Sequence, residues 1–408
     1  MVKLSDEGKI LADKARKQAG FTNKQKLYKD KEDGLPNGLS LGTVKRFWRQ
    51  ESISIDSFII ICKAIKIDDW CSLIDWKNDT KNWKTAELKD ELNPYHHQGV
   101  GALAVMTNNN EIILASGSYD STINIWKIKG DRVTHLKTLA EHKKDVSSLI
   151  FIENQLISGS YDRTIKTWNT ASWECIDTIE NGHNSEIECL ALTTDDQYLF
   201  VSSCNSLEIY LWVWDLNPKK LLYKLQEHKT GRLYPSTIAN AVLGLVVNHN
   251  TVISSGMDGR LISWQISNEG DKVIVIPTLI NDENSLELRA ITSSAISPDR
   301  EYLAVGENSK QITIWDIAKK SLVYNTQGKH DFPNILALAY HPTGKILASA
   351  SFDADNPIIR LWNPHNGDIV TTLTTYSHSS PIRSLIFSPD GKMLIAGDEE
   401  GHIFLWGV

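Results

Sequence analysis

The side chains best suited to chemistry in this sequence are histidine, serine and aspartate residues that recur together, each time followed by a tryptophan. A serine bonded to a histidine that an aspartate orients is the arrangement of a hydrolase nucleophile. Four sets share this order: His96, Ser116, Asp120 and Trp126; His142, Ser158, Asp162 and Trp168; His228, Ser254, Asp258 and Trp264; and His330, Ser349, Asp353 and Trp362. Because an enzyme needs one nucleophile and every set includes an indole donor, the recurrence favours a structural hydrogen-bond chain.

Other motifs that carry chemistry are missing from the sequence. It contains no GxxxxGK[ST] phosphate loop, no HExxH zinc motif and no GxSxG nucleophile elbow. His96 and His97 form a tempting metal pair, but His96 already belongs to one of the four sets. The sequence therefore predicts a non-enzymatic protein with no metal, cofactor or small-molecule substrate.

Short apolar runs of strand length lead up to each tryptophan of a regular series. In His142–Trp168 they are Val146–Ile152, Gln155–Ser158 and Thr164–Trp168, separated by polar turns. The series is Trp126, Trp168, Trp214, Trp264, Trp315, Trp362 and Trp406, at intervals of 42, 46, 50, 51, 47 and 44 residues. A unit of about four short strands with such a period predicts the blades of a β-propeller.

These units resemble WD40 repeats. Trp214-Asp215 and Trp315-Asp316 keep the dipeptide that names the family, and Ser116-Gly117 and Ser158-Gly159 keep the signature of its second strand. The resemblance covers residues 85–408 and implies a mainly β, seven-bladed propeller. It also implies that the four sets are tetrads of blades one, two, four and six. In each tetrad the aspartate accepts from the histidine, whose other nitrogen bonds the serine, and the serine bonds the indole.

The remaining blades depart from the tetrad, and we expect them to be less stable. In blade three, His183 and Ser202 are expected at the histidine and serine positions and Ser206 replaces the aspartate; blade five has no histidine; and blade seven has Ala396 and Glu400 at two of the positions. Blade seven also lacks an outer strand after Trp406. Because an open ring leaves an unpaired edge, we expect Lys84–Leu92 to supply that strand.

One end of the propeller is predicted to bind a partner. The loops into the first strand and between the second and third strands open at this end, and they are lengthened at Thr230–Ala239, Ile280–Glu287 and Ala354–Pro357. The residues before the tetrad aspartates are aromatic or soft: Tyr119, Tyr161, Met257 and Phe352. Such side chains are favoured at protein interfaces. The alternative is that they only pack against neighbouring blades.

Residues 1–75 carry helix signals, including a capping box at Thr22 and Gln25, and 76–84 are expected to be a linker. Short helices with a turn before a basic one resemble the phage-repressor-like helix-turn-helix class. They also resemble an N-terminal module of bacterial signalling proteins. Bound to DNA, the module would use Thr43, Lys45, Arg46 and Arg49. The alternatives are a protein-docking adaptor or an ordinary solvated face.

Charge and cysteine content complete the picture. The net charge is −7, with 17 Lys and Arg against 12 Asp and Glu in residues 1–84, and 26 against 38 in the remainder. The five cysteines show no zinc spacing, which favours reduced thiols of an intracellular protein. Without a signal peptide or a membrane-spanning run, a cytoplasmic protein is expected.

Together these patterns predict a protein-interaction scaffold with an N-terminal helical adaptor, active in bacterial signalling or regulation. Its expected partner is a protein on the propeller face. The alternative is a DNA-binding transcriptional regulator whose propeller senses or recruits a partner.

Overall fold

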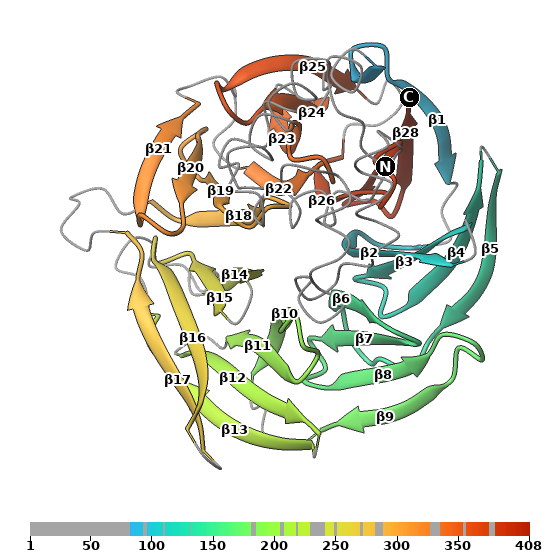
Figure 1. The fold of residues 1–408 in the computed structure, drawn as a ribbon. Coiled ribbons are helices and arrows are strands. Elements are labelled where there is room, and N and C mark those ends of the chain that lie inside the picture. The colour runs from blue at the N-terminus through green and yellow to red at the C-terminus, as the bar shows by residue number, and fades with distance from the viewer. Residues whose placement is uncertain are drawn as a thin grey trace, which may run out of the picture. The chain divides into compact units, whose positions relative to one another are not determined.

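The computed structural model describes residues 82–408 apart from 93–95, 109–110, 131, 181–184, 205–207, 218, 229–240, 249–250, 270–271, 282–288, 327–334, 354–355 and 375–379. The predicted helices of residues 1–75 lie outside the described residues, as do Thr43, Lys45, Arg46 and Arg49. The chain divides into two units, Met1–Lys84 and Thr85–Val408. The second unit is a ring of seven four-stranded antiparallel sheets (Figure 1), which confirms the predicted seven-bladed propeller.

The strands of blades one to three follow the chain from the inside of the ring outwards. Blade one contains β2 (Val100–Asn108), β3 (Glu111–Ser118), β4 (Ile123–Lys129) and β5 (Arg132–Leu139). Blade two contains β6 (Val146–Ile152), β7 (Gln155–Ser160), β8 (Ile165–Asn169) and β9 (Cys175–Ile179). Blade three contains β10 (Glu186–Leu192), β11 (Tyr198–Cys204), β12 (Ile209–Leu216) and β13 (Lys219–Leu225).

Blades four to six repeat this order. Blade four contains β14 (Val242–Asn248), β15 (Thr251–Gly256), β16 (Leu261–Glu269) and β17 (Lys272–Leu279). Blade five contains β18 (Ile291–Ile296), β19 (Tyr302–Glu307), β20 (Ile312–Asp316) and β21 (Ser321–Asn325). Blade six contains β22 (Ile335–Tyr340), β23 (Leu347–Asp353), β24 (Asn356–Asn363) and β25 (Asp368–Thr374).

Blade seven joins the two ends of the propeller sequence. Its inner strands are β26 (Ile382–Phe387), β27 (Met393–Asp398) and β28 (Ile403–Gly407), and its outer strand is β1 (Glu87–Leu92). β1 pairs antiparallel with β28, from Glu87 opposite Gly407 to Leu92 opposite Ile403. The predicted closure by the segment before blade one is therefore confirmed. Trp83, just before β1 in the expected linker, is only 1% exposed.

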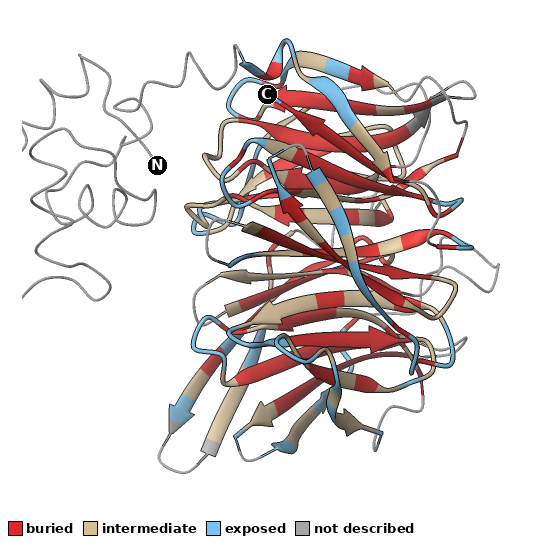
Figure 2. Ribbon diagram, turned by 90° about the vertical axis from the view of Figure 1, so that its right-hand side faces the viewer, coloured by how far each residue is buried: buried red, intermediate tan, exposed pale blue. Residues whose placement is uncertain are grey.

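Burial explains why each strand has its sequence. β3 is buried along almost its whole length because neighbouring blades cover both of its faces, whereas most residues of the outermost β5 are exposed. Figure 2 shows the same change from buried to exposed across the blades. The Ser–Gly signature also has a packing reason. A Cβ at Gly117 would lie 2.7 Å from Val146 Cγ1, and one at Gly159 would lie 2.8 Å from Ile187 Cγ2, so a side chain there would push the next blade away.

The tryptophans whose spacing predicted the blades form the outer part of the core. Trp126, Trp168, Trp214, Trp264, Trp362 and Trp406 are each at most 8% exposed. Trp315 of blade five is only half-buried. Among the described residues, no helix is long and apolar enough to cross a membrane.

Candidate functional site

Blade one contains a complete hydrogen-bonded tetrad. The Nδ1 atom of His96 donates to Asp120 Oδ2 at 3.1 Å, and Nε2 accepts from Ser116 Oγ at 2.8 Å. The indole Nε1 of Trp126 donates to the same serine oxygen at 2.9 Å. This series of hydrogen bonds thus links the turn before β4 to the segment before β2, and that segment to the middle of β3 and β4.

Blades two and four contain the same arrangement. His142 lies 2.9 Å from Asp162 and 2.8 Å from Ser158, to which Trp168 donates at 2.9 Å. In blade four the corresponding distances among His228, Asp258, Ser254 and Trp264 are 2.9, 2.7 and 2.8 Å. In blade six Trp362 donates to Ser349 at 2.7 Å, while His330 and the side chain of Asp353 lie outside the described residues.

The tetrad aspartates are held by more donors than the sequence suggested. Asp120 also accepts from the His97 amide, and from the amide and hydroxyl of Thr122. Burial by itself raises the pKa of Asp120, but the hydrogen bonds from His96 and Thr122 outweigh it and hold the pKa below its usual value. Asp162 has a lowered pKa for the same reasons, with Thr164 in the place of Thr122. A Thr two residues after the aspartate is the signal that predicts this extra support.

The tetrad serines are not placed for catalysis. Ser116, Ser158 and Ser254 are 0% exposed, so a substrate has no access to their hydroxyls. Each hydroxyl oxygen is also bonded on both sides, by an imidazole and by an indole. Among the described residues there is no group of three or more His, Cys, Asp or Glu side chains arranged to hold a metal ion.

Blade three corrects our expectation for Ser202. In the other blades the tetrad serine lies two residues after the strand position that pairs with the tryptophan, as Ser158 follows Leu156 opposite Trp168. In blade three Leu199 pairs with Trp214, so Val201 occupies the serine position of that tryptophan. The indole that donates to a serine is instead that of Trp212, which pairs with Val201 and donates to Ser203, two residues further on, at 2.7 Å. Ser202 therefore points to the other face of β11, where its hydroxyl donates to Val242 O of blade four at 3.1 Å. The predicted His183 and Ser206 lie outside the described residues.

Blades five and seven use other polar contacts. In blade five, Val305 occupies the serine position, and Trp315 donates to Thr313, which in turn donates to Glu307. In blade seven, Asp398 is 0% exposed and accepts from His402 Nδ1 at 2.8 Å, four residues later. Asp398, two residues before the expected Glu400, thus replaces the tetrad aspartate as the anchor of the turn.

The residues before the tetrad aspartates occupy equivalent places at one end of the ring. Antiparallel pairing puts the start of the first and third strands of each blade at this end, with the ends of the second and fourth, as Val100 opposite Ser118 and Ile123 opposite Leu139 show. At this end the amides of Tyr119, Tyr161 and Met257 each donate to the residue before or near their own blade's first strand, at 2.9 Å. All three side chains are half-buried, whereas that of Phe352 lies outside the described residues.

The two tyrosines differ in their contacts. Tyr119 lies on the backbone of β2, because a Cβ at Gly101 would be 2.7 Å from its ring atom Cε1. Its hydroxyl has no hydrogen-bond partner among the described residues. Tyr161 donates instead to Glu188 Oε2 of blade three at 2.8 Å, and Cys204 Sγ donates to Glu188 Oε1 at 3.2 Å. Tyr161 thus bridges two blades, whereas no described residue bonds the Tyr119 hydroxyl.

Two ion pairs lie beside these tyrosines. Arg383 Nη2 of blade seven lies 2.8 Å from Glu399 Oε1, and Lys144 of blade two lies 3.1 Å from Glu186 of blade three. Most of the lengthened loops at this end, including Thr230–Ala239, fall largely or wholly outside the described residues. Asn281 is described, and it fixes the start of the blade-five loop by donating to Gly259 O and accepting from the Leu261 amide.

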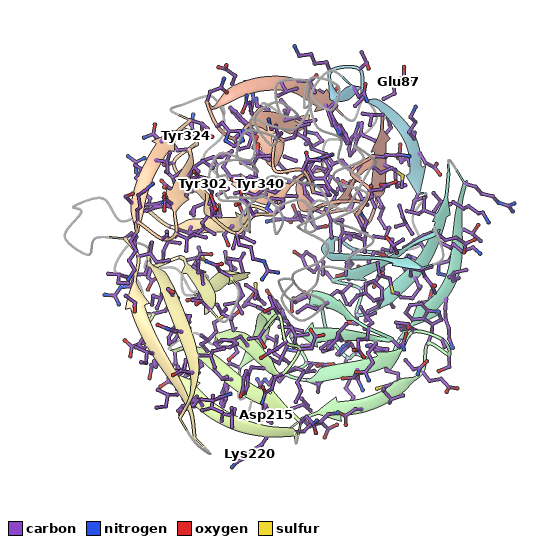
Figure 3. All side chains as sticks on the ribbon, viewed as in Figure 1. Glu87, Asp215, Lys220, Tyr302, Tyr324 and Tyr340 are labelled. Atoms are coloured by element: carbon purple, nitrogen blue, oxygen red, sulfur yellow. The ribbon has the colours of Figure 1, made fainter. Side chains whose placement is uncertain are left out.

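A second group of aromatic residues packs between blades five and six (Figure 3). Tyr302, Tyr324 and Tyr340 come from β19, β21 and β22 and pack against one hydrophobic cluster that includes Trp362. The Tyr324 hydroxyl donates to Pro364 O. Tyr302 begins β19, which places it at the opposite end of the ring from Tyr119. These tyrosines serve packing, which makes them useful controls for the first group.

The fold and the three described tetrads define the class of protein, a seven-bladed β-propeller of repeated blades. Comparison with known families agrees: residues 90–127, 133–169 and 173–214 match the WD domain, G-beta repeat, and residues 230–405 match the Nucleolar protein 10-like, N-terminal domain. The chain therefore carries WD40 repeats. Because the matched residues begin at 90, the helix-turn-helix resemblance of residues 1–75 stays a prediction.

Individual relatives share the propeller at low identity. The chain is 23% identical over 312 residues to WD repeat-containing protein 26 homolog of Arabidopsis thaliana, covering 74% of this chain and 47% of that protein. It is 28% identical over 157 residues to Target of rapamycin complex subunit wat1 of Schizosaccharomyces pombe, covering 38% of this chain and 45% of that protein. The match to Periodic tryptophan protein 2 of Arabidopsis thaliana spans 22% of that protein. These relatives are eukaryotic and give no support to the expected bacterial setting. WD40 propellers of this kind generally act as non-catalytic interaction scaffolds.

Proposed function

We propose that this protein is a non-enzymatic scaffold whose propeller binds a protein partner at the end that carries Tyr119 and Tyr161, with residues 1–75 acting as an adaptor. The observation that carries the proposal is Tyr119. Its ring is half-buried and held on a glycine backbone, and no described residue bonds its hydroxyl, so it offers rigid contact area and a hydrogen bond at low entropic cost.

Two further observations support a binding role over catalysis. The serines that resemble nucleophiles are fully buried, and their hydroxyls are consumed by the tetrads. One relative is by name a subunit of a complex, which is consistent with a propeller that assembles with other proteins. The alternative role as a DNA-binding regulator rests on Thr43, Lys45, Arg46 and Arg49, and no observation among the described residues favours it.

The test is partner capture with matched tyrosine variants. The full chain, tagged, is used to capture a partner that is then identified and purified. Tyr119→Ala with Tyr161→Ala should lower its affinity by about 2 kcal/mol or more, because central aromatics carry most of the energy of an interface. Tyr302→Ala with Tyr324→Ala removes two tyrosines from the packing cluster and should leave affinity unchanged. Affinity lost only with the second pair would place the binding surface elsewhere.

A further inference from the structure

The innermost strand of every blade carries an irregularity at the same place. In all seven blades, two residues of the inner strand that flank a third one pair with consecutive residues of the second strand. The residue between them is therefore left outside the pairing, as in a β-bulge. All seven of these residues are half-buried. Only two are charged, Glu188 in blade three and Arg383 in blade seven. A bulge turns its extra side chain out of the regular sheet, so these two charges occupy special positions near the partner-binding end.

The two charges are compensated differently. Arg383 is paired with Glu399 of its own blade at 2.8 Å. Glu188 accepts only from two neutral donors, the Tyr161 hydroxyl and the Cys204 thiol, and no described Lys, Arg or His forms an ion pair with it. Each carboxylate oxygen has accepted one hydrogen bond, which leaves each with capacity for another. Hydrogen bonds therefore hold the negative charge of Glu188, and no cation among the described residues pairs with it.

Neighbouring groups make this charge more costly. Burial raises the pKa of Glu188 above its usual value against the hydrogen bonds from Cys204 and Tyr161, and the charges of Glu186 and Asp145 raise it further. Asp145 is itself half-buried with a raised pKa, caused first by burial. Of these three carboxylates, Glu186 alone forms an ion pair with a cation of the described residues, Lys144. A positive charge brought to this place would relieve the repulsion.

We infer that the partner contacts this end of the propeller through a basic segment, one arginine or lysine of which pairs with Glu188 and lies against Tyr119 and Tyr161. The inference rests on the proposed function and names the chemistry of its partner. The carboxylate accepts the cation, while the tyrosine rings cover its apolar stem and attract it through their faces. The excess of acidic residues in 85–408, 38 against 26 basic ones, favours the approach of such a segment.

Synthetic peptides test this directly on the full chain. The probe is GRSGRSGRG, compared with GKSGKSGKG and the uncharged GQSGQSGQG by fluorescence anisotropy at low ionic strength. The basic peptides should bind and the glutamine peptide should not. Glu188→Gln should weaken binding of the arginine peptide by about tenfold, since it removes the charge while the amide oxygen can still accept from the Tyr161 hydroxyl. Glu153→Gln is the matched control, because Glu153 is an exposed carboxylate in the turn between β6 and β7 at the opposite end.

The outcomes separate this inference from the proposed function. Equal binding of the arginine peptide to the Glu188→Gln and Glu153→Gln proteins would mean general attraction to an acidic surface and would overturn the inference. So would equal binding of the glutamine peptide, or no binding of either basic peptide. If the captured partner depends on Tyr119 and Tyr161 but binds the Glu188→Gln protein unchanged, the cationic contact is wrong and the scaffold proposal stands. Thermal midpoints of the two variants show that both proteins are folded.

Discussion

Blades one, two and four differ from blades five and seven in how they fix the turn between their second and third strands. The first group uses the tetrad, in which a histidine from the preceding connection reaches a buried serine and the turn aspartate. The second group uses shorter-range substitutes, such as Asp398 with His402 or Glu307 with Thr313. All five form four-stranded sheets of the same order. The tetrad is therefore one way to anchor a blade, whereas the alternating apolar strands and the tryptophan are what make it a blade.

Blade seven is the sharpest case, since it has neither a described tetrad nor a continuous sequence. Deleting residues 1–92 removes β1, unpairs β28 and uncovers the core around Leu92 and Ile403. We expect this deletion to cost about 4 kcal/mol or more of the free energy of unfolding, because an entire strand and its burial are lost. Deleting only residues 1–81 keeps β1 and should cost far less. Urea denaturation of both proteins measures the difference, and equal midpoints would contradict the role of β1.

A pair of aspartate variants compares the two kinds of anchor. Asp162→Ala removes the acceptor of His142, Thr164 and the Lys143 amide, and should cost about 1–3 kcal/mol. Asp398→Ala in blade seven should cost a similar amount, because Asp398 is fully buried and accepts from His402 and from two backbone amides.

Glu400→Ala is the control for this pair. Glu400 is exposed, so its loss should change stability by less than about 0.5 kcal/mol. Urea midpoints give all three values. A cost for Asp398→Ala as small as that for Glu400→Ala would support the expectation that blade seven is less stable than blade two.

The sequence was sufficient to predict the features that every blade repeats. It did not predict contacts that occur in one blade alone. Trp spacing and strand alternation predicted all seven blades, because each blade must bury the same faces. Blade three was misassigned because consecutive side chains in a strand point to opposite faces, so an error of one residue moved Ser202 onto the wrong face. The Asp398–His402 pair replaces the tetrad locally and leaves no repeat signal. Glu188 and Tyr161 meet across two blades, 27 residues apart, so no local pattern marks their contact.

The smallest effect we predict concerns two carboxylates with opposite pKa shifts. The pKa of Asp162 is lowered in the folded state, so its charge stabilises the fold above the ordinary Asp pKa, and this contribution is lost as the pH falls through the folded value. The pKa of Glu188 is raised, so its ionisation destabilises the fold as the pH rises through the folded value, and this cost is absent below the ordinary Glu pKa. The charge of Asp162 thus stabilises the fold, whereas the charge of Glu188 destabilises it.

Glu188→Gln should therefore stabilise the protein at pH 7, by a few tenths of a kcal/mol after solvent screening, with the gain vanishing near pH 4. Asp162→Asn should destabilise it at both pH values. The groups that surround Glu188, namely Tyr161, Cys204, Glu186 and Asp145, remain in place in both variants. Urea denaturation at the two pH values measures these signs. A loss of stability at pH 7 in the Glu188→Gln protein would mean that the charge of Glu188 stabilises the fold by itself. The charge would then need no cation from a partner to explain it.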